Sequence, residues 1–425
     1  MKNFNDRYAQ IIRERYEENL ISGKAAVEYM NNSTAIYKGE PIPCLYMPKL
    51  FSQKSFDFLK EAAATICSIL DKVITQYLKD PAYRKLFPFT PELEELILLE
   101  SGYPRLLPIA RLDIFFNEED FSFKFCEFNA DGASAMNEDR ELNIALRKTD
   151  AFIQMQQEYD ITSFELFDSW VEEFMKIYST YKGAVKSPRI LITDFMDRAT
   201  PNEFIEFKKA FQKAGYDADI CEIRDFVRAD AVYRRAVTRD IMERKDEVSD
   251  FLQAAQDNSC CIIGHFRTQI IHNKAIFMIL KRPETSAFLT QAEQEYIQRH
   301  IPETYPLNDE TYKMAKNKDE WIIKPEDFYA SRGVYAGIDM TDDAWQNALL
   351  HGVNSSYILQ EYHQPYQSIN INFNNSPRPD FEMFNNITGM FIYNGKLVGL
   401  YSRAGQKGTI SAAARGLTLA SMLVL

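Results

Sequence analysis

The sequence predicts a mixed α/β protein, and three observations support this fold class. Residues 56–78 carry apolar side chains along one helical face. Residues 187–265 alternate short apolar runs with amphipathic stretches, which is typical of a parallel sheet with helical crossovers. Residues 111–129 and 389–403 each place alternating apolar and polar residues around a polar turn, which predicts two antiparallel hairpins.

Composition narrows the class of partner. The chain has 425 residues, 46% of them hydrophobic, which is enough for full cores in more than one domain. The net charge of −12 argues against nucleic acid or an anionic membrane as the main partner. The six cysteines show neither a CxxC pair nor a zinc-like spacing, and no signal peptide or membrane span is visible. We therefore expect a cytoplasmic protein.

The elements fall into four expected regions. The first is mainly helical and holds helices at 56–78 and 93–99. The second holds the first hairpin and a helical stretch from about 138 to 175. The third is a small α/β unit, and the fourth holds the remaining strands, a polar segment at 367–386 (a loop or an exposed strand pair) and the second hairpin. The expected boundaries are 1–103, 104–180, 181–268 and 269–425.

The small α/β unit begins with a strand at 189–193, and an amphipathic helix at 202–214 ends before Gly215. Further strands are expected at 219–223, 231–233 and 259–263. Asp194-Phe195-Met196-Asp197 follows the first strand where a nucleotide-binding unit would have glycines. This argues against a Rossmann dinucleotide site and against a P-loop.

The first hairpin carries the most informative polar residues. Residues i and i+2 of a strand share a face, so Arg111 lies beside Asp113 and Glu127 beside Asn129. Paired across the hairpin, these side chains would present two carboxylates and an amide oxygen, ligands that suit Mg²⁺. Acids on the exposed face of a hairpin are also common without any function, and an Arg–Asp pair there contributes little.

The same alternation places Phe123 and Phe125 on the face of Glu127, opposite Lys124 and Cys126. We therefore expect an uninterrupted second strand from 123 to 129.

The last region brings further polar groups in sequence order. Lys274 precedes an apolar helix, and a strand at 321–325 ends in Lys324-Pro325. A loop with Ser331, Arg332 and Gly333 follows, and the second hairpin, which turns at Asn394-Gly395, ends at Arg403.

Together these groups could form a nucleotide site. Lysines supply point charges for phosphates, and a glycine-containing loop lets backbone N–H groups approach them. Each group alone has an ordinary explanation, because Lys324 before proline is typical of a solvated strand end and Arg332-Gly333 of a turn. The order of the whole set is the informative feature.

That order resembles the circularly permuted ATP-grasp ligases, most closely the glutathionylspermidine synthase-like family. The resemblance implies an ATP-grasp fold and roles for three groups of residues. Mg²⁺ would be bound by Asp113, Glu127 and Asn129. ATP would be bound by Lys274, Lys324, the lid residues Ser331, Arg332 and Gly333, and the adenine hinge Gln360, Glu361 and Tyr362. Arg111 and Arg403 would be catalytic. Tyr233-Arg234-Arg235 is similar to a motif of related permuted proteins.

Two features depart from the family. Asn129-Ala130-Asp131 is followed by Gly132-Ala133-Ser134 where the family has Thr-Pro-Thr, which leaves its glutathione and spermidine substrates open for this chain. Lys316 and Lys318 also lie closer to Lys324 than Lys274 does, so either could be the second phosphate-binding lysine.

The resulting hypothesis is an ADP-forming ligase that uses ATP and Mg²⁺ to join a small-molecule or peptide carboxylate to an amine. The alternatives are an ATP-grasp protein that binds nucleotide without ligating, and a purely structural or interaction protein. The sequence identifies neither the substrates nor the oligomeric state.

Overall fold

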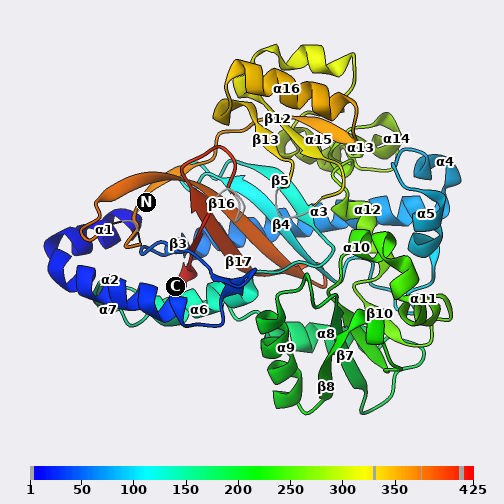
Figure 1. Ribbon diagram of the computed structural model, residues 1–425, viewed down its shortest axis with the longest axis horizontal. Helices are drawn as coiled ribbons and strands as arrows, with labels where there is room; N and C mark the ends of the chain where they lie inside the picture. Colours follow the sequence, from blue (N-terminus) through cyan, green and yellow to red (C-terminus); the bar gives the residue numbers. More distant parts are fainter. Residues whose placement is uncertain (1–3, 329–331, 375, 411–415) are drawn as a thin grey trace.

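A six-stranded antiparallel sheet forms the centre of the computed structural model, which describes residues 4–328, 332–374, 376–410 and 416–425 (Figure 1). Its strand order is β18-β17-β16-β4-β5, and β15 pairs with β16 at one end of that long strand. The strands are β4 (Ile109–Phe116), β5 (Phe123–Asn129), β15 (Gln367–Ile371), β16 (Phe381–Tyr393), β17 (Lys396–Gly405) and β18 (Leu417–Leu419).

Both predicted hairpins are confirmed. β16 and β17 meet at Asn394 and Gly395, whose φ angles of 50° and 82° match the two-residue turn that Asn-Gly favours. β4 and β5 pair with Asp113 opposite Glu127 and Arg111 opposite Asn129. The segment at 367–386 forms the strand pair of β15 with the start of β16, the second of the two expected alternatives.

The expected uninterrupted alternation in β5 is wrong. Ile114 pairs with Phe125 while Asp113 pairs with Glu127, so Cys126 is an extra residue in β5. This bulge puts Phe125 and Glu127 on opposite faces, because Ile114 and Asp113 themselves face opposite sides. Phe125 can therefore join Leu112 and Ile114 in the hydrophobic core while Glu127 stays beside Asp113.

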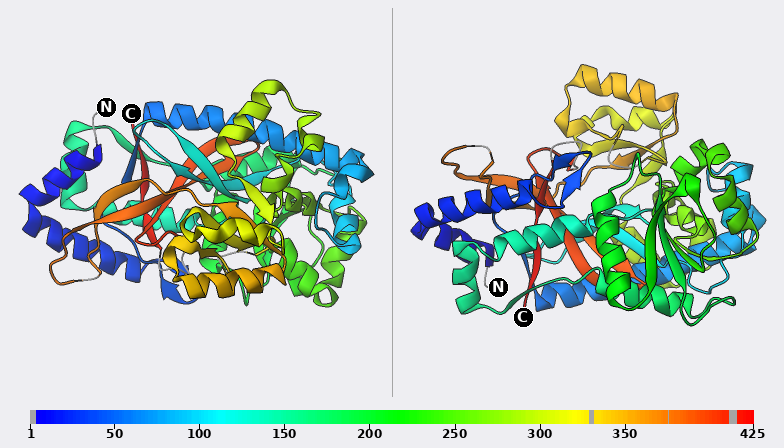
Figure 2. Two further views of the ribbon diagram at one scale, coloured as in Figure 1. Left: turned by 90° about the horizontal axis from the view of Figure 1, so that it is seen from above. Right: turned by 60° about the horizontal axis from the view of Figure 1, so that its bottom comes forward.

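The helix predicted at 56–78 is α3 (Gln53–Lys79), and it packs along the central sheet (Figure 2). Ser52 caps it by accepting a hydrogen bond from the backbone N–H of Ser55. Its apolar face, including Leu59, Ile66 and Val73, is buried in the core that also contains Leu400 of β17. The short helices α4 (Pro81–Arg84) and α5 (Pro91–Leu98) follow. In the described part of the chain, no helix combines the length and apolar character that a membrane crossing needs.

The small α/β unit has the predicted parallel sheet, in the order β10-β9-β7-β8, at the lower right of Figure 1. The strands are β7 (Arg189–Asp194), β8 (Asp217–Glu222), β9 (Ala231–Arg234) and β10 (Cys261–Ile263). The helices of this part are α8 (Asp168–Tyr178), α9 (Pro201–Lys213), α10 (Thr238–Glu243) and α11 (Ser249–Gln256), followed by α12 (Gln269–His272) and α13 (Ile276–Ile279). Around Lys274 there are thus two one-turn helices instead of one.

A third sheet, in the order β11-β14-β12-β13, stands above the central sheet in Figure 1 and is covered by α16 (Asp342–Val353). Its strands are β11 (Thr304–Pro306), β12 (Trp321–Pro325), β13 (Tyr335–Ala336) and β14 (Tyr357–Glu361). The helices α14 (Pro283–Ser286) and α15 (Gln291–His300) precede it. The strands predicted from residues 321 and 357 are confirmed.

At the other end of the molecule lie α1 (Phe4–Glu14), α2 (Tyr16–Asn31), α6 (Met136–Leu146) and α7 (Asp150–Glu158). The pair β1 (Ile36–Tyr37) and β2 (Glu40–Pro41) follows α2. A small sheet combines β3 (Lys49–Ser52), β19 (Ser421–Val424) and β6 (Ile161–Ser163). The helical stretch expected from 138 to 175 is therefore divided by β6, and the apolar C-terminal run packs on the core as strands.

Two buried arginines fasten the small α/β unit to the loop that follows β5, one through an ion pair and the other through a hydrogen bond. Arg234 lies 2.6 Å from Asp131, with side chains 0% and 2% exposed, and Asp131 also accepts the backbone N–H of Thr238. Arg235 lies 2.8 Å from Glu203 and donates a second hydrogen bond to the carbonyl of Ala133. The Tyr-Arg-Arg run noted in the sequence thus has a structural role.

Replacing Arg234 with Met should lower the free energy of unfolding by about 3–5 kcal/mol, because Asp131 would remain as a buried charge without its partner. Chemical denaturation of the variant and the wild-type protein measures this. Lys213→Met is the matched control, since it breaks the exposed pair with Asp168 and should change stability little. Equal effects of the two substitutions would contradict the role assigned to Arg234.

Candidate active site

A pocket lies between the central sheet and the β12–β14 sheet, with an empty volume of about 730 Å³ that includes open solvent. Segments distant in sequence contribute to it: the first hairpin, the segment after α12, the strands β12 and β14, and the end of β17. The predicted site residues that line it are Asp113, Glu127, Lys274, Lys324, Gln360, Glu361, Tyr362 and Arg403. We call it the nucleotide pocket below.

The carboxylate of Asp113 is held by two arginines from different strands. Arg111 donates from Nε and Nη2 to the two oxygens, at 2.7 and 3.0 Å, and Arg403 donates to Oδ2 at 3.2 Å. Asn129 donates to the same oxygen at 3.3 Å. Gly389 of β16 pairs with Asp113, and a Cβ there would lie 2.8 Å from Arg111 Cδ and 2.9 Å from Asp113 Oδ1. Residue 389 is therefore a glycine because the side chain of Arg111 passes closely over β16 at this position.

Glu127 faces Lys274, with 2.9 Å between Oε1 and Nζ. Lys274 Nζ also donates to the carbonyl of Phe328, and its backbone N–H donates to Glu326, so the lysine is fixed from both ends. Burial acts to raise the pKa of Glu127, but Lys274 and then Lys324 favour the charged form more strongly and bring this pKa to about 2. Glu127 is therefore ionised at neutral pH.

Lys324 is the most informative cation of the pocket. Only 5% of the residue is exposed, and Nζ donates to Gln360 Oε1 at 2.7 Å and to the carbonyl of Cys126 at 3.0 Å. It forms no ion pair with a carboxylate of the described residues: its direct partners are neutral oxygens, and Glu127 interacts with it only at longer range. A buried charge of this kind is costly unless an anion approaches it. A phosphate is an anion of suitable size and charge.

Of the other predicted residues, Arg111 and Asn129 line a second pocket, which is described below. Ser331 lies outside the described residues. Arg332 is exposed and is not among the lining residues, whereas Val334, beyond Gly333, does line the pocket. Of the lysines considered for the second phosphate position, Lys274 lines the pocket, while Lys318 pairs with Asp319 outside it.

The hairpin acids have the chemistry of a magnesium site. Within the described residues, no three His, Cys, Asp or Glu side chains gather in a group that could hold a metal ion. Asp113 and Glu127 nevertheless stand opposite each other, with the amide of Asn129 beside them. Mg²⁺ needs only one or two protein carboxylates, because water and phosphate complete its shell. These residues therefore fit the ion.

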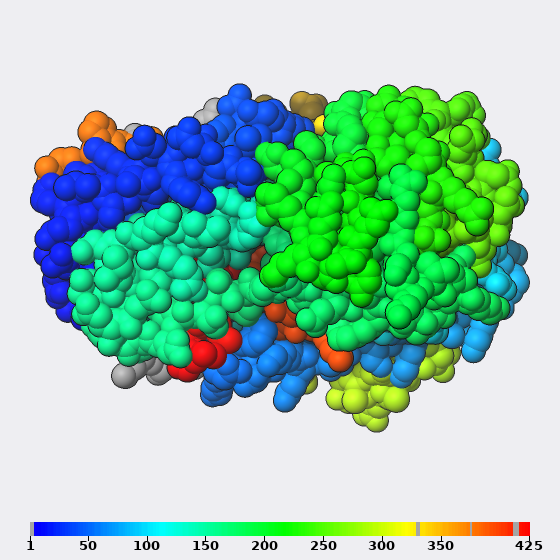
Figure 3. Space-filling model, turned by 90° about the horizontal axis from the view of Figure 1, so that it is seen from below, coloured from blue at the N-terminus to red at the C-terminus, as the bar shows by residue number. Residues whose placement is uncertain are grey.

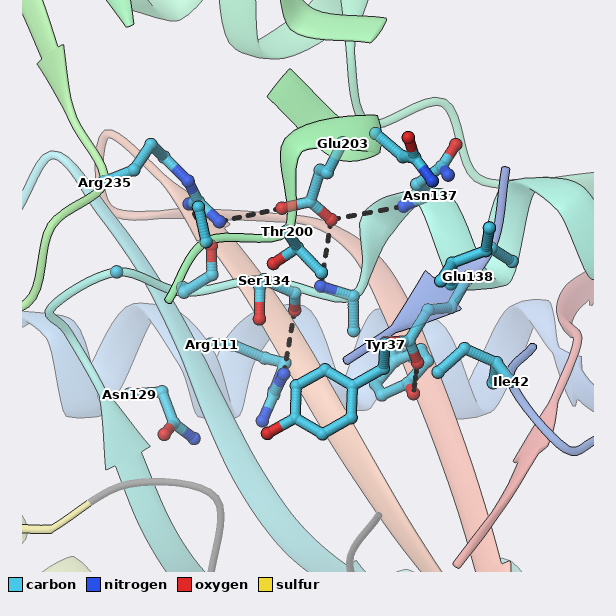
Figure 4. Close-up of a pocket in the computed structure, with 18 of the residues that line it drawn as sticks. Tyr37, Ile42, Arg111, Asn129, Ser134, Asn137, Glu138, Thr200, Glu203 and Arg235 are labelled. Atoms are coloured by element: carbon cyan, nitrogen blue, oxygen red, sulfur yellow. Dashed lines mark hydrogen bonds and ion pairs between the residues drawn. The ribbon is translucent and has the colours of Figure 1, made fainter. Parts of the chain in front are cut away.

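A second pocket adjoins the first and was not foreseen from the sequence. It has an empty volume of about 1440 Å³, which includes open solvent, and Figure 4 shows Arg111, Glu138 and Glu203 among the residues that line it. Arg403 lines both pockets. Glu203 shapes it by accepting the backbone N–H groups of Ala135, Met136 and Asn137 at 3.0, 2.8 and 3.3 Å. This clamp holds Ala135 at a φ of 90°, an unusual value for a residue with a Cβ. Glu203 gave no signal in the sequence, where it is an ordinary acid in the first turn of a helix.

No protein-family model matches the sequence. No curated protein matches it either.

Among solved structures, a glutathione synthetase-like effector from Globodera pallida is similar over 96% of both chains, with a TM-score of 0.57 and 12% identity. D-cycloserine synthetase DcsG matches 55% of this chain and 91% of its own at a TM-score of 0.29, also with 12% identity. The ATP-grasp ligase PsnB, complexed with a minimal precursor, Mg and ADP, matches 56% of this chain and 88% of its own chain, with a TM-score of 0.23 and 12% identity. Only the first similarity is strong enough to interpret, and at 12% identity it concerns the fold alone. The mixed α/β fold class expected from the sequence is confirmed.

Replacing Lys274 with Met should raise the pKa of Glu127 from about 2, because burial would then act against a weaker set of positive charges. Carboxyl chemical shifts followed by NMR during an acid titration measure this pKa. The exposed Lys186→Met is the control and should leave it unchanged.

The pH dependence of the free energy of unfolding follows from the same pKa shift of Glu127. In the wild-type protein the pKa of Glu127 is below its ordinary value of 4.5, so its contribution is complete above about pH 4.5 and is lost as the pH falls towards 2. In the Lys274→Met variant, the free energy of unfolding should depend much less on pH over this range. A titration of Glu127 that is the same in both proteins would show that Lys274 does not set its charge.

Proposed function

We propose that the protein is an ADP-forming carboxylate–amine ligase of the circularly permuted ATP-grasp type, related to the glutathionylspermidine synthase-like proteins. The observation that carries this proposal is Lys324, a buried cation without a carboxylate partner, in one pocket with Lys274, Arg403 and the acids of the first hairpin. Such a pocket suits the polyphosphate of a nucleotide, because its fixed cations can bind several anionic phosphate oxygens at once.

The proposed reaction has two steps. An oxygen of the substrate carboxylate attacks the γ-phosphorus of ATP, ADP leaves, and an acyl phosphate forms. The amine nitrogen then attacks the acyl carbon, the bond from this carbon to the phosphate oxygen breaks, and inorganic phosphate leaves while the nitrogen loses its proton. Lys274 and Lys324 would bind phosphates, and Arg111 and Arg403 would stabilise the charge on the transferring phosphoryl group. Phosphoryl transfer depends mainly on such positioning and charge neutralisation.

Asp113, Glu127 and Asn129 are the residues that would hold Mg²⁺. When bound, the ion would supply further neutralisation of phosphate charge. The chain's own part is to hold the two carboxylates in place: Lys274 fixes Glu127, and the two arginines fix Asp113 in the geometry described above.

The hinge and the lid belong to the same proposal. Gln360, Glu361 and Tyr362 lie at the end of β14 in the wall of the nucleotide pocket, where the adenine would lie. Ser331, Arg332 and Gly333 are proposed as the lid over the phosphates. The division into four regions stays a prediction.

One observation favours a second candidate, a nucleotide-binding protein without ligase activity. Both oxygens of Asp113 already accept hydrogen bonds from arginine, and Glu127 is already paired with Lys274. If these pairs persist with nucleotide bound, the carboxylates are not available to a metal ion, and binding would proceed without turnover.

ATP with Mg²⁺ should raise the unfolding temperature, since a ligand at 100 times its Kd stabilises a protein by about 2.7 kcal/mol. Lys324→Ala should remove most of this shift because it deletes the buried cation that meets the phosphates. Lys186→Ala, which removes an exposed lysine, is the matched control and should behave as the wild-type protein does. Differential scanning fluorimetry gives all three results, and a wild-type protein unaffected by ATP and Mg²⁺ would overturn the nucleotide site.

Turnover separates the two candidates. The ligase should sustain ADP release over many turnovers only when a carboxylate and an amine are both supplied, and Glu127→Gln should reduce this rate by about 10²–10³-fold. ADP release coupled to NADH oxidation measures it across pools of carboxylates and amines. Nucleotide binding without substrate-dependent ADP release would leave the second candidate in place.

A further inference from the structure

We propose that Arg239, a residue of the small α/β unit, is a positioning residue for the nucleotide pocket and holds Lys274 in place for a phosphate. This inference rests on the proposed function, because Lys274 is assigned to phosphate binding there. Arg239 is not among the described residues that line either pocket. It acts through residues 326–328, which follow β12 and which we call the bridging segment.

Arg239 contacts the bridging segment at two consecutive residues. It projects from α10, which lies at the top of the small α/β unit in Figure 1. Its guanidinium carbon is 3.8 Å from the centre of the Phe328 ring, and its Nη1 donates a hydrogen bond to the carbonyl of Asp327. A guanidinium group this close to an aromatic face is attracted to it, and a charged donor strengthens a hydrogen bond. One side chain therefore holds both the backbone and the ring of the bridging segment.

The bridging segment in turn holds Lys274. The carbonyl of Phe328 accepts a hydrogen bond from Lys274 Nζ at 2.7 Å, and the carbonyl of Glu326 accepts one from the backbone N–H of Lys274 at 2.8 Å. The ammonium group also pairs with Glu127, at 2.9 Å. A lysine side chain is a flexible stem, so its partners decide where the charge lies. Direct contacts thus link Arg239 to the ammonium group of Lys274.

Arg239 is itself held on a rigid base. Thr238, the first residue of α10, is fully buried and donates its backbone N–H to Asp131, the carboxylate that pairs with Arg234. Ile241 of the same helix is also fully buried in the core. Figure 3 shows the small α/β unit (green) packed against the segment that contains α6 and α7 (teal). This unit can therefore act as a fixed support from which Arg239 reaches the bridging segment.

A guanidinium group suits this role better than an ammonium group would. The Nε atom of Arg239 lies 2.9 Å from Glu243, Nη1 donates to Asp327, and the flat face covers the ring of Phe328. A lysine has one point charge and no flat face, so it cannot make these three contacts together. Arg239→Lys should therefore not replace the arginine.

An arginine over an aromatic ring can also be an ordinary packing contact. The side chain of Arg239 is 30% exposed, and a cation–π contact at such a position contributes little to stability. The positioning role predicts a different pattern from a packing role. The affinity for a ligand with phosphates should fall, while the free energy of unfolding and the affinity for a ligand without phosphates should change little.

Two ligands test this pattern by calorimetric titration into the full chain: a non-hydrolysable ATP analogue with Mg²⁺, and adenosine, which has no phosphate. Arg239→Met should weaken binding of the analogue about tenfold, which corresponds to about 1.4 kcal/mol, and should leave adenosine binding unchanged. Arg239→Lys should bind the analogue nearly as weakly, and it takes the place of Arg239→Met if that variant does not fold. Glu243→Gln is the matched control, because it removes the exposed partner of Arg239 without touching the bridging segment, and it should bind both ligands as the wild-type protein does.

Hydrogen exchange without nucleotide tests the link to Lys274 itself. The backbone N–H of Lys274 donates to Glu326, so it should exchange about tenfold faster in Arg239→Met than in the wild-type protein. Glu243→Gln should leave this rate unchanged. Chemical denaturation of the same variants checks that their free energies of unfolding stay close to that of the wild-type protein.

An unchanged affinity of Arg239→Met for the analogue, equal losses for the analogue and adenosine, or unchanged exchange at Lys274 would each overturn the inference. A wild-type protein that binds neither ligand would instead reject the proposed function. The exchange of Lys274 distinguishes the two failures, because it is measured without nucleotide.

Discussion

The arrangement of the site depends on the carboxylate of Asp113 and the two arginines that hold it. Arg111 comes from the same strand and Arg403 from β17, and the strand between them, β16, passes Asp113 at a glycine. This one interaction joins three neighbouring strands of the central sheet on the face that carries the site. It also fixes Arg403, which lines both pockets, and Arg111, which lines the second one. Any change in sheet register would separate these groups, because a shift of one residue reverses the side to which each side chain points.

The two pockets differ in the charged groups that lack an ion pair within the described residues. In the nucleotide pocket this group is the cation Lys324, and in the second pocket these groups are the carboxyl groups of Glu138 and Asp194. Burial raises the pKa of both carboxyl groups, which reduces the cost of leaving them without a cationic partner. The small α/β unit contributes to this arrangement through Arg234 and Arg235, which fix the loop between the two pockets.

Similarity in fold and similarity in site are separate matters here. The glutathione synthetase-like effector matches nearly the whole chain at 12% identity, so the architecture is shared although few side chains are. Function has to be argued from the residues of this chain, since one fold can carry different activities. The proposed magnesium and nucleotide roles are argued from contacts between those residues, and each is open to the experiments described above.

Local pattern by itself determined the two hairpins, the helix from Gln53 and the parallel unit, because apolar periodicity and turn residues act over a few neighbouring positions. It also determined that Asp113 and Glu127 belong together, since i and i+2 share a face on both strands. Tertiary structure alone decided that Cys126 bulges, which kept Phe125 in the core while Glu127 stayed in the site. It likewise decided that β16 pairs with β4 and that Glu138 and Asp194 meet in one pocket. These features bring together residues that are far apart in the chain. Such contacts depend on the packing of the whole core, so they cannot be predicted from any short stretch of sequence.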